Sequence, residues 1–137
     1  VVALIILVGG YDEKGELRRP TIKVKTRKDR DGETVWKKGA PRKVFTGGRI
    51  NWFGRDPDWE DVLGFRGKQD VESPHGQWTR IEYIADGDTL TYFVNGVMVN
   101  QAFDVKPASG KILFQTEGAE LYFRKIELHP LPKKGNP

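Results

Sequence analysis

The fold class is decided by the stretch from Trp78 to Asn100, which reads WTRIEYIADGDTLTYFVNGVMVN. Two runs rich in β-branched and aromatic residues, Trp78–Ala85 and Thr89–Asn95, flank Asp86-Gly87-Asp88, which is typical of a tight hairpin turn. Asn95-Gly96 then marks a second hairpin, which leads into a third strand. The stretch therefore predicts successive antiparallel strands.

The remainder of the chain also predicts strands and no helix. No segment keeps a 3.6-residue apolar period, and 16 Gly and 8 Pro divide the chain into short pieces. We expect strands at 1–8, 21–27, 33–36, 111–117 and 120–128, a turn at 29–32, and an irregular stretch at 39–60. The expected fold is an all-β antiparallel sandwich or jelly roll over residues 1–131, with a tail at 132–137.

The N-terminal run Val1–Val8 is continuously apolar and ends at Gly9-Gly10. This pattern fits a strand buried on both faces, and the absence of a basic lead-in argues against a signal peptide. Such a strand needs neighbours on both sides. We therefore expect a fragment of a longer domain that lacks its first strands, or a partner chain that supplies them.

Composition excludes several classes of protein and site. With 137 residues, 37% hydrophobic and 31% charged, the chain has the composition of one globular domain. No apolar run reaches 18 residues, so no membrane span is expected. The absence of Cys excludes disulfides, thiolate zinc sites and cysteine nucleophiles.

Charge is distributed unevenly along the chain. Residues 18–55 carry 13 Lys and Arg against three acids, a local charge of +10, which leaves −6 on the rest. Within 21–27 the basic residues alternate with Ile22 and Val24, as on the solvent face of an antiparallel strand. That interpretation is favoured over nucleic-acid binding, for which no motif is present. We expect no nucleic-acid partner.

A series of short motifs marks the C-terminal half. In chain order they are His75-Gly76-Gln77-Trp78-Thr79, Asn95-Gly96, Val99-Asn100, Pro107–Ile112, Gln115, Glu117–Glu120 and Phe123–Leu128. Their order and spacing resemble the 3-keto-disaccharide hydrolase domain family, strongly over 74–131 and more loosely over 1–73. Thr79, Phe114 and Lys125 stand where that family usually has Asn, Leu and Asn.

The resemblance implies a concanavalin-like jelly roll that acts on sugars oxidised at carbon 3, in the periplasm or outside a bacterial cell. A ketone at carbon 3 acidifies the proton on carbon 2, so a base can remove it and the glycosidic oxygen can then leave from carbon 1. Such a site needs a general base and a group that stabilises the enolate. No cofactor is expected. The two His and the scattered acids lack metal-ligand spacing, although a divalent cation on oxygen ligands stays open.

Strand alternation selects the candidate site residues. On 111–117, Gln115 and Glu117 share one face. If the apolar residues of 120–128 face the core, Tyr122 and Arg124 lie on the outer, concave face with them. We expect Glu117 to act in catalysis and Gln115, Tyr122 and Arg124 to bind the sugar. His75 is a second catalytic candidate, because a histidine side chain can act as a base near neutral pH.

Arg66 and Trp78 complete the substrate-binding candidates, and each candidate has a structural alternative. Trp78 can fill the core, and His75 can be exposed without a role. Arg124 can form an ion pair with Glu82 or Glu120. Glu117 can accept hydrogen bonds from turn amides, and Gln115 can pair with neighbouring backbone.

Three functions follow from these residues. The first is an enzyme that cleaves 3-keto-glycosides. The second is a non-catalytic carbohydrate-binding or interaction module that uses the same concave face. The third is a structural subunit whose sheet is completed by a strand from a partner chain.

Overall fold

The computed structural model describes residues 6–52, 56, 58, 60, 62, 64–110, 112–116 and 120–132. These residues form eight strands: β1 (Ile6–Val8), β2 (Thr21–Lys28), β3 (Thr34–Trp36), β4 (Arg42–Phe45), β5 (Gly48–Ile50), β6 (Ile81–Asp86), β7 (Thr89–Val94) and β8 (Val97–Lys106). No helix that could cross a membrane occurs in this part of the chain.

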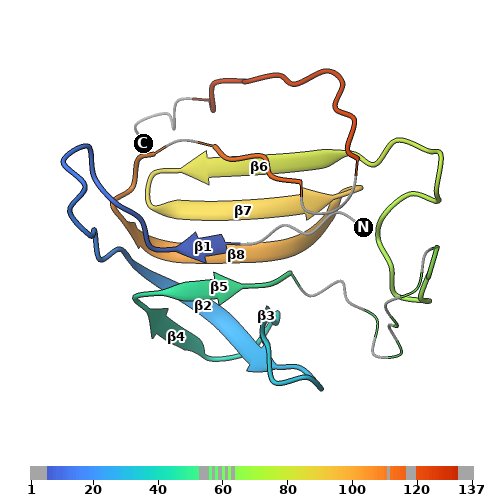
Figure 1. Cartoon of the computed structure of the whole chain (residues 1–137), viewed down its shortest axis with the longest axis horizontal. Helices are drawn as coiled ribbons and strands as arrows, with labels where there is room; N and C mark the ends of the chain where they lie inside the picture. Colours follow the sequence, from blue (N-terminus) through green and yellow to red (C-terminus); the bar gives the residue numbers. More distant parts are fainter. Residues whose placement is uncertain are drawn as a thin grey trace.

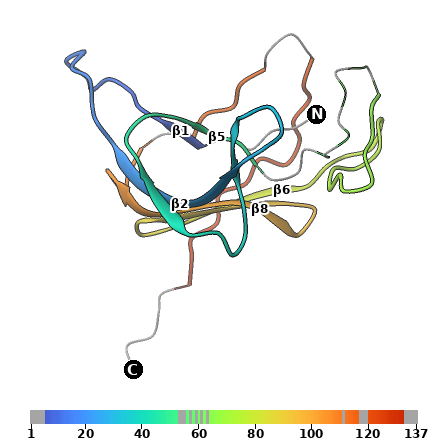
Figure 2. The same cartoon turned by 90° about the horizontal axis from the view of Figure 1, so that it is seen from below.

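The strands form two sheets. The larger sheet has the order β3-β2-β8-β7-β6, and β4 also pairs with β2; the smaller sheet consists of β1 and β5. The strand pairs are antiparallel (Figure 1). Figure 2 shows β1 and β5 on one side of the larger sheet. The described residues therefore form an all-β sandwich, as the sequence predicts.

Both predicted hairpins are confirmed. Asn95 and Gly96 have φ angles of 47° and 79°, the two positive values that a type I′ turn requires, and they join β7 to β8. Gly87 (φ 61°) opens the two-residue turn between β6 and β7. β6 begins at Ile81, three residues later than predicted. The backbone that precedes β6 forms a hydrogen bond with a side chain rather than with a neighbouring strand. The Ser73 hydroxyl donates to the Trp78 carbonyl oxygen at 2.9 Å.

The core lies between the two sheets. Its main cluster joins both sheets and contains Ile6, Ile22, Val24, Trp36, Ile50 and Ala102, and a second cluster contains Trp52, Val94 and Val99. On β2, Ile22 and Val24 are buried whereas Lys23 is exposed, which confirms the predicted alternation.

A bulge in β8 places a polar side chain in this core. Tyr92 lies opposite Asn100 while Phe93 lies opposite Met98, so Val99 is the extra residue. As a result the successive residues Val99 and Asn100 are both fully buried. The Asn100 amide nitrogen donates to the Ile50 carbonyl oxygen at 3.1 Å and thereby links the two sheets.

The structure corrects the prediction that 39–60 is irregular. β4 and β5 lie inside this stretch. Both strands are short and carry little alternation of their own. β4 forms because β2 offers a long edge for pairing, and β5 forms because β1 pairs with it. Their positions thus depend on tertiary contacts that local sequence does not encode.

The structure also corrects the two strands predicted at 111–117 and 120–128. The described residues of these segments, 112–116 and 120–132, form no strand and appear as coil (Figure 1). Alternation makes a segment suitable for a strand, but a ladder also needs a neighbouring edge, which these residues do not find. Their side chains are exposed as a consequence.

The N-terminal prediction is met only in part. Residues 1–5 lie outside the described residues, and Ile6–Val8 form β1. Ile6 is buried as expected. The sequence predicts a neighbouring strand on each side of β1. In the described part of the chain β1 has one neighbouring strand, β5.

Candidate functional site

The candidate site is built by the segment before β6, residues 64–80, which has no regular secondary structure. Side chains hold it in place. The Asn95 amide nitrogen in the β7–β8 turn donates to the Val71 carbonyl oxygen at 2.8 Å and to the Ser73 hydroxyl at 3.2 Å. The Gly67 N–H donates to an Asp70 carboxylate oxygen at 2.7 Å. Asn95 therefore anchors the loop to the large sheet, and the bond between Gly67 and Asp70 fixes the shape of the loop itself.

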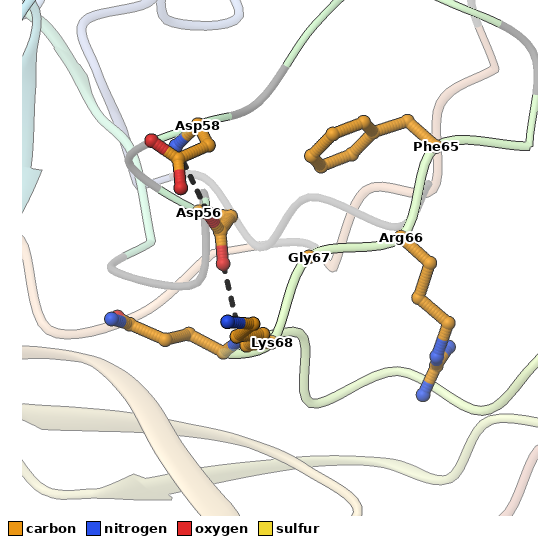
Figure 3. A pocket seen from close by; sticks show the side chains of 7 residues that line it. Asp56, Asp58, Phe65, Arg66, Gly67 and Lys68 are labelled. Atoms are coloured by element: carbon orange, nitrogen blue, oxygen red, sulfur yellow. Dashed lines mark hydrogen bonds between the residues drawn. The ribbon is translucent and has the colours of Figure 1, made fainter.

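A hollow of about 290 Å³ lies against this segment (Figure 3). It is lined by Asp56, Asp58, Phe65, Arg66, Gly67, Lys68 and Gln69. Figure 3 shows the Phe65 ring across the hollow from the two carboxylates, with the Arg66 side chain turned away from them. The Arg66 guanidinium instead donates to the Glu72 carbonyl oxygen at 2.8 Å.

Asp56 organises the hollow. It is only 6% exposed, and its carboxylate accepts hydrogen bonds from the N–H of Asp58 (2.9 Å) and of Gln69 (3.1 Å). These backbone bonds lower the pKa of Asp56, because they stabilise the charged form. Gly67 packs so closely that a Cβ there would overlap the Asp56 side chain. Asp56 is thus committed to shaping the loop, which leaves Asp58 as the carboxylate available to a ligand.

The second feature is a stacked pair formed by residues 46 positions apart. The Arg124 guanidinium carbon lies 4.2 Å from the centroid of the Trp78 ring. Trp78 is 49% exposed, so it does not fill the core. Arg124 does not pair with Glu82, whose carboxylate is bound by Arg80 at 2.7 Å. A cation–π contact therefore takes the place of the ion pair that the sequence suggested as an alternative.

The remaining candidates in the described part of the chain are His75, Tyr122 and Gln115. His75 is exposed in the turn that the Gln77 N–H closes on the Pro74 carbonyl oxygen at 3.0 Å. Tyr122 is 71% exposed, and its hydroxyl bonds to Glu120, which raises the pKa of Tyr122. Gln115 is exposed, in a segment that contacts the Arg124 segment through Phe114 and Phe123 (ring centroids 5.1 Å apart).

The structure brings together Trp78 and Arg124 but does not test the whole predicted set. Glu117 lies outside the described residues. Gln115 and Tyr122 do not sit on strand faces, since their segments form no ladder. Within the described ranges, no three His, Asp or Glu side chains lie close enough to hold a metal ion.

Sequence reasoning missed the residues around Arg66. Asp56, Asp58, Phe65 and Gly67 line the hollow, and Arg66 was the only sequence candidate in this region. One usable signal is the pair Asp56 and Asp58, because closely spaced acids in a loop often accept amide hydrogen bonds. A hollow with an aromatic ring, a carboxylate and an amide side chain has the chemical character of a sugar site.

Comparison with known families agrees with this chemistry. A family model described as the 3-keto-alpha-glucoside-1,2-lyase-like domain matches residues 16–129. The matched range includes the hollow, Trp78 and Arg124, and it confirms the resemblance seen in the motifs. Neither a curated protein nor a solved structure gave a match to this chain.

Proposed function

Because the chain belongs to the family of 3-keto-alpha-glucoside-1,2-lyase-like domains, which ties it to carbohydrate chemistry, we propose that it cleaves glycosides oxidised at carbon 3. A base takes the proton from carbon 2, and the electron pair forms an enolate with the 3-keto oxygen. The enolate then expels the glycosidic oxygen from carbon 1, and that oxygen takes up a proton. Water adds across the carbon 1–carbon 2 double bond to give the free 3-keto-sugar.

The observation that carries this proposal is the Arg124 guanidinium over Trp78. Among the described residues none forms an ion pair with Arg124, so its charge is not neutralised by a carboxylate there. A fixed cation beside an exposed ring suits an enolate, because it stabilises the negative charge that develops on the 3-keto oxygen. The exposed part of the Trp78 ring offers an apolar face to the sugar.

The proposal assigns the base to Glu117, with His75 as the second candidate. His75 precedes Trp78 by three residues in the same loop, and its side chain is exposed and therefore open to a ligand. Gln115 and Tyr122 are proposed to bind sugar hydroxyls. The hollow at Asp58 and Phe65 is proposed to hold a second sugar ring.

The test is release of reducing sugar from a 3-keto-disaccharide by variants of the full chain. Arg124→Gln is expected to lower kcat about 100-fold or more with little change in KM, because it removes a group that acts mainly in the transition state. Glu117→Gln and His75→Ala test the two base candidates, and loss of a general base costs about 100-fold or more. Arg30→Gln removes an exposed arginine in the β2–β3 turn and serves as the matched control.

Two results would contradict the proposal. One is an Arg124→Gln variant that folds and keeps the wild-type kcat. The other is a wild-type chain that binds the 3-keto-disaccharide without releasing any product. The second result favours the non-catalytic carbohydrate-binding module, which the hollow beside Phe65 also supports.

The other candidate function is a structural subunit whose sheet is completed by a strand from a partner chain, and exposed apolar side chains favour it. Large hydrophobic residues are exposed along the segments after β8, at Ile112, Leu113, Phe114, Leu121, Tyr122, Phe123, Ile126, Leu128 and Leu131. Such a run is typical of a surface that a further strand covers. Light scattering of the isolated chain tests this idea, because a chain that stays monodisperse and monomeric at high concentration argues against it.

A further inference from the structure

The outer face of the large sheet carries a cluster of positive charge away from the core. Successive side chains of a strand point to opposite faces of the sheet. On β2, Ile22 and Val24 point into the core, so Lys23 and Lys25 point outward. Lys25 lies directly opposite Arg42 of β4 in the ladder. We call Lys23, Lys25 and Arg42 the basic face.

Like charges directly opposite each other in a ladder destabilise a sheet. Asp104 lies close enough to Arg42 to feel its charge but is bound mainly by Lys23, and the three acids within residues 18–55 have other partners. Asp29 accepts turn amides, Asp31 lies 3.6 Å from Arg30, and Glu33 binds Arg49 at 2.7 Å. These are the three acids of residues 18–55. The arrangement therefore concentrates positive charge at some cost in stability, which is unexpected for a purely structural strand face.

The basic face borders a hollow of about 370 Å³ lined by Thr21, Ile22, Lys23, Val44, Asp88, Asp104 and Lys106. Lys23 binds Asp104 at 2.6 Å, and this contact lowers the pKa of Asp104, with smaller contributions from Arg42 and Lys106. Asp104 has a φ of 51°, a left-handed conformation that costs energy for a residue with a side chain. In this conformation the Asp104 carboxylate lies near three cationic side chains, those of Lys23, Arg42 and Lys106.

An apolar surface lies beside these charges. The Arg42 guanidinium stacks on the Phe103 ring at 3.8 Å from its centroid, which holds the guanidinium flat. Val44, directly opposite Lys23, is exposed. A ligand on this face therefore meets cations, two carboxylates (Asp88 and Asp104) and apolar side chains together.

We propose that the basic face and its hollow bind an acidic polysaccharide, a chain of sugars that carry carboxylate or sulfate groups. Lys25 and Arg42 bind the acid groups, Asp88 and Asp104 accept hydrogen bonds from hydroxyls, and Val44 packs against the sugar ring. A nucleic acid fits less well, because its phosphates would meet the two carboxylates and its backbone offers few hydroxyls. The site is separate from Trp78 and Arg124 and extends the proposed function rather than repeating it.

The experiment measures binding of the full chain to polygalacturonate, dextran sulfate, neutral dextran and duplex DNA at low and high salt. The wild type is expected to bind one of the two acidic polymers more tightly than DNA and dextran, and to lose that affinity at high salt. The double variant Lys25→Gln, Arg42→Gln is expected to weaken the binding about tenfold or more. Arg80→Gln removes an exposed charge elsewhere on the molecule and is expected to bind like the wild type.

The outcomes separate this site from the catalytic proposal. Arg124→Gln is expected to keep polymer binding, so failure of one proposal does not decide the other. Equal binding of neutral dextran, or an unaffected double variant, overturns the acidic-polysaccharide site. Tighter binding of DNA than of either acidic polymer overturns it in favour of a nucleic-acid surface. Circular dichroism of each variant verifies that the fold is retained.

Discussion

Replacing Asn100 by Ala is expected to destabilise the fold by about 1–3 kcal/mol. Asn100 is fully buried, and its amide nitrogen donates to the Ile50 carbonyl oxygen at 3.1 Å, across the interior of the sandwich. The variant leaves that carbonyl without this donor in an apolar environment, so the folded state carries its desolvation cost. With an unfolding entropy of about 2.1 cal/mol/K per residue, this loss lowers Tm by roughly 3–10 °C for a chain of this length.

Thermal unfolding followed by circular dichroism measures the effect, and the neighbouring residue provides the control. Gln101 is half-buried, and its amide nitrogen donates to the Thr91 hydroxyl at 3.1 Å within the large sheet. Gln101→Ala is expected to cost less than about 1 kcal/mol, because solvent can replace a half-exposed bond. Asn100→Asp is a second variant of the same size without the donor. If Asn100→Ala unfolds at the same temperature as Gln101→Ala, or Asn100→Asp at the wild-type temperature, the link between the sheets contributes nothing and the reasoning is refuted.

Three further predictions concern the loop and the basic face. Gly67→Ala is expected to destabilise the chain by about 1–3 kcal/mol in urea unfolding, because its Cβ overlaps Asp56; an unchanged midpoint would contradict this packing. Lys25→Glu is expected to stabilise the fold by about 0.2–1 kcal/mol at low salt, by converting a like-charge pair with Arg42 into an ion pair, and the gain should vanish in 1 M salt. Since backbone bonds lower the pKa of Asp56 from 3.8, its contribution to stability is present above about pH 3.8 and is lost as the pH falls through the lower folded pKa. Asp56→Asn should flatten that part of the stability–pH curve, and an identical acid titration of both proteins would disprove the assignment.

The parts of the fold that sequence predicted are those encoded by adjacent residues. Asn95-Gly96 specifies a turn because both residues accept positive φ, and the two strands on either side then pair without further information. The outward basic residues of β2 follow in the same way from alternation with Ile22 and Val24. In each case the physical cause lies within a few residues of the pattern.

The failures share the opposite property. β4 was missed because four residues, Arg42–Phe45, gain their strand conformation from the edge of β2. Residues 111–117 and 120–128 are predicted as strands, yet the described residues of these segments have no edge to join. Pairing is a property of two segments, so a pattern in one of them predicts only that it is suited to a ladder.

The same reasoning explains why the Trp78–Arg124 pair could not be predicted and why it suits a reactive site. The alternation pattern describes each residue only within its own strand. Its two structural alternatives were a core position for Trp78 and an ion pair for Arg124, whereas in the structure the two side chains stack on each other and Trp78 is exposed. An exposed cation–π contact contributes only about 0.5–1 kcal/mol. A hydrogen bond to a charged group contributes about 1.5–3 kcal/mol, so an enolate oxygen can draw the guanidinium from the ring at little cost. In the function we propose, this contact is strong enough to orient Arg124 and weak enough to yield to the substrate.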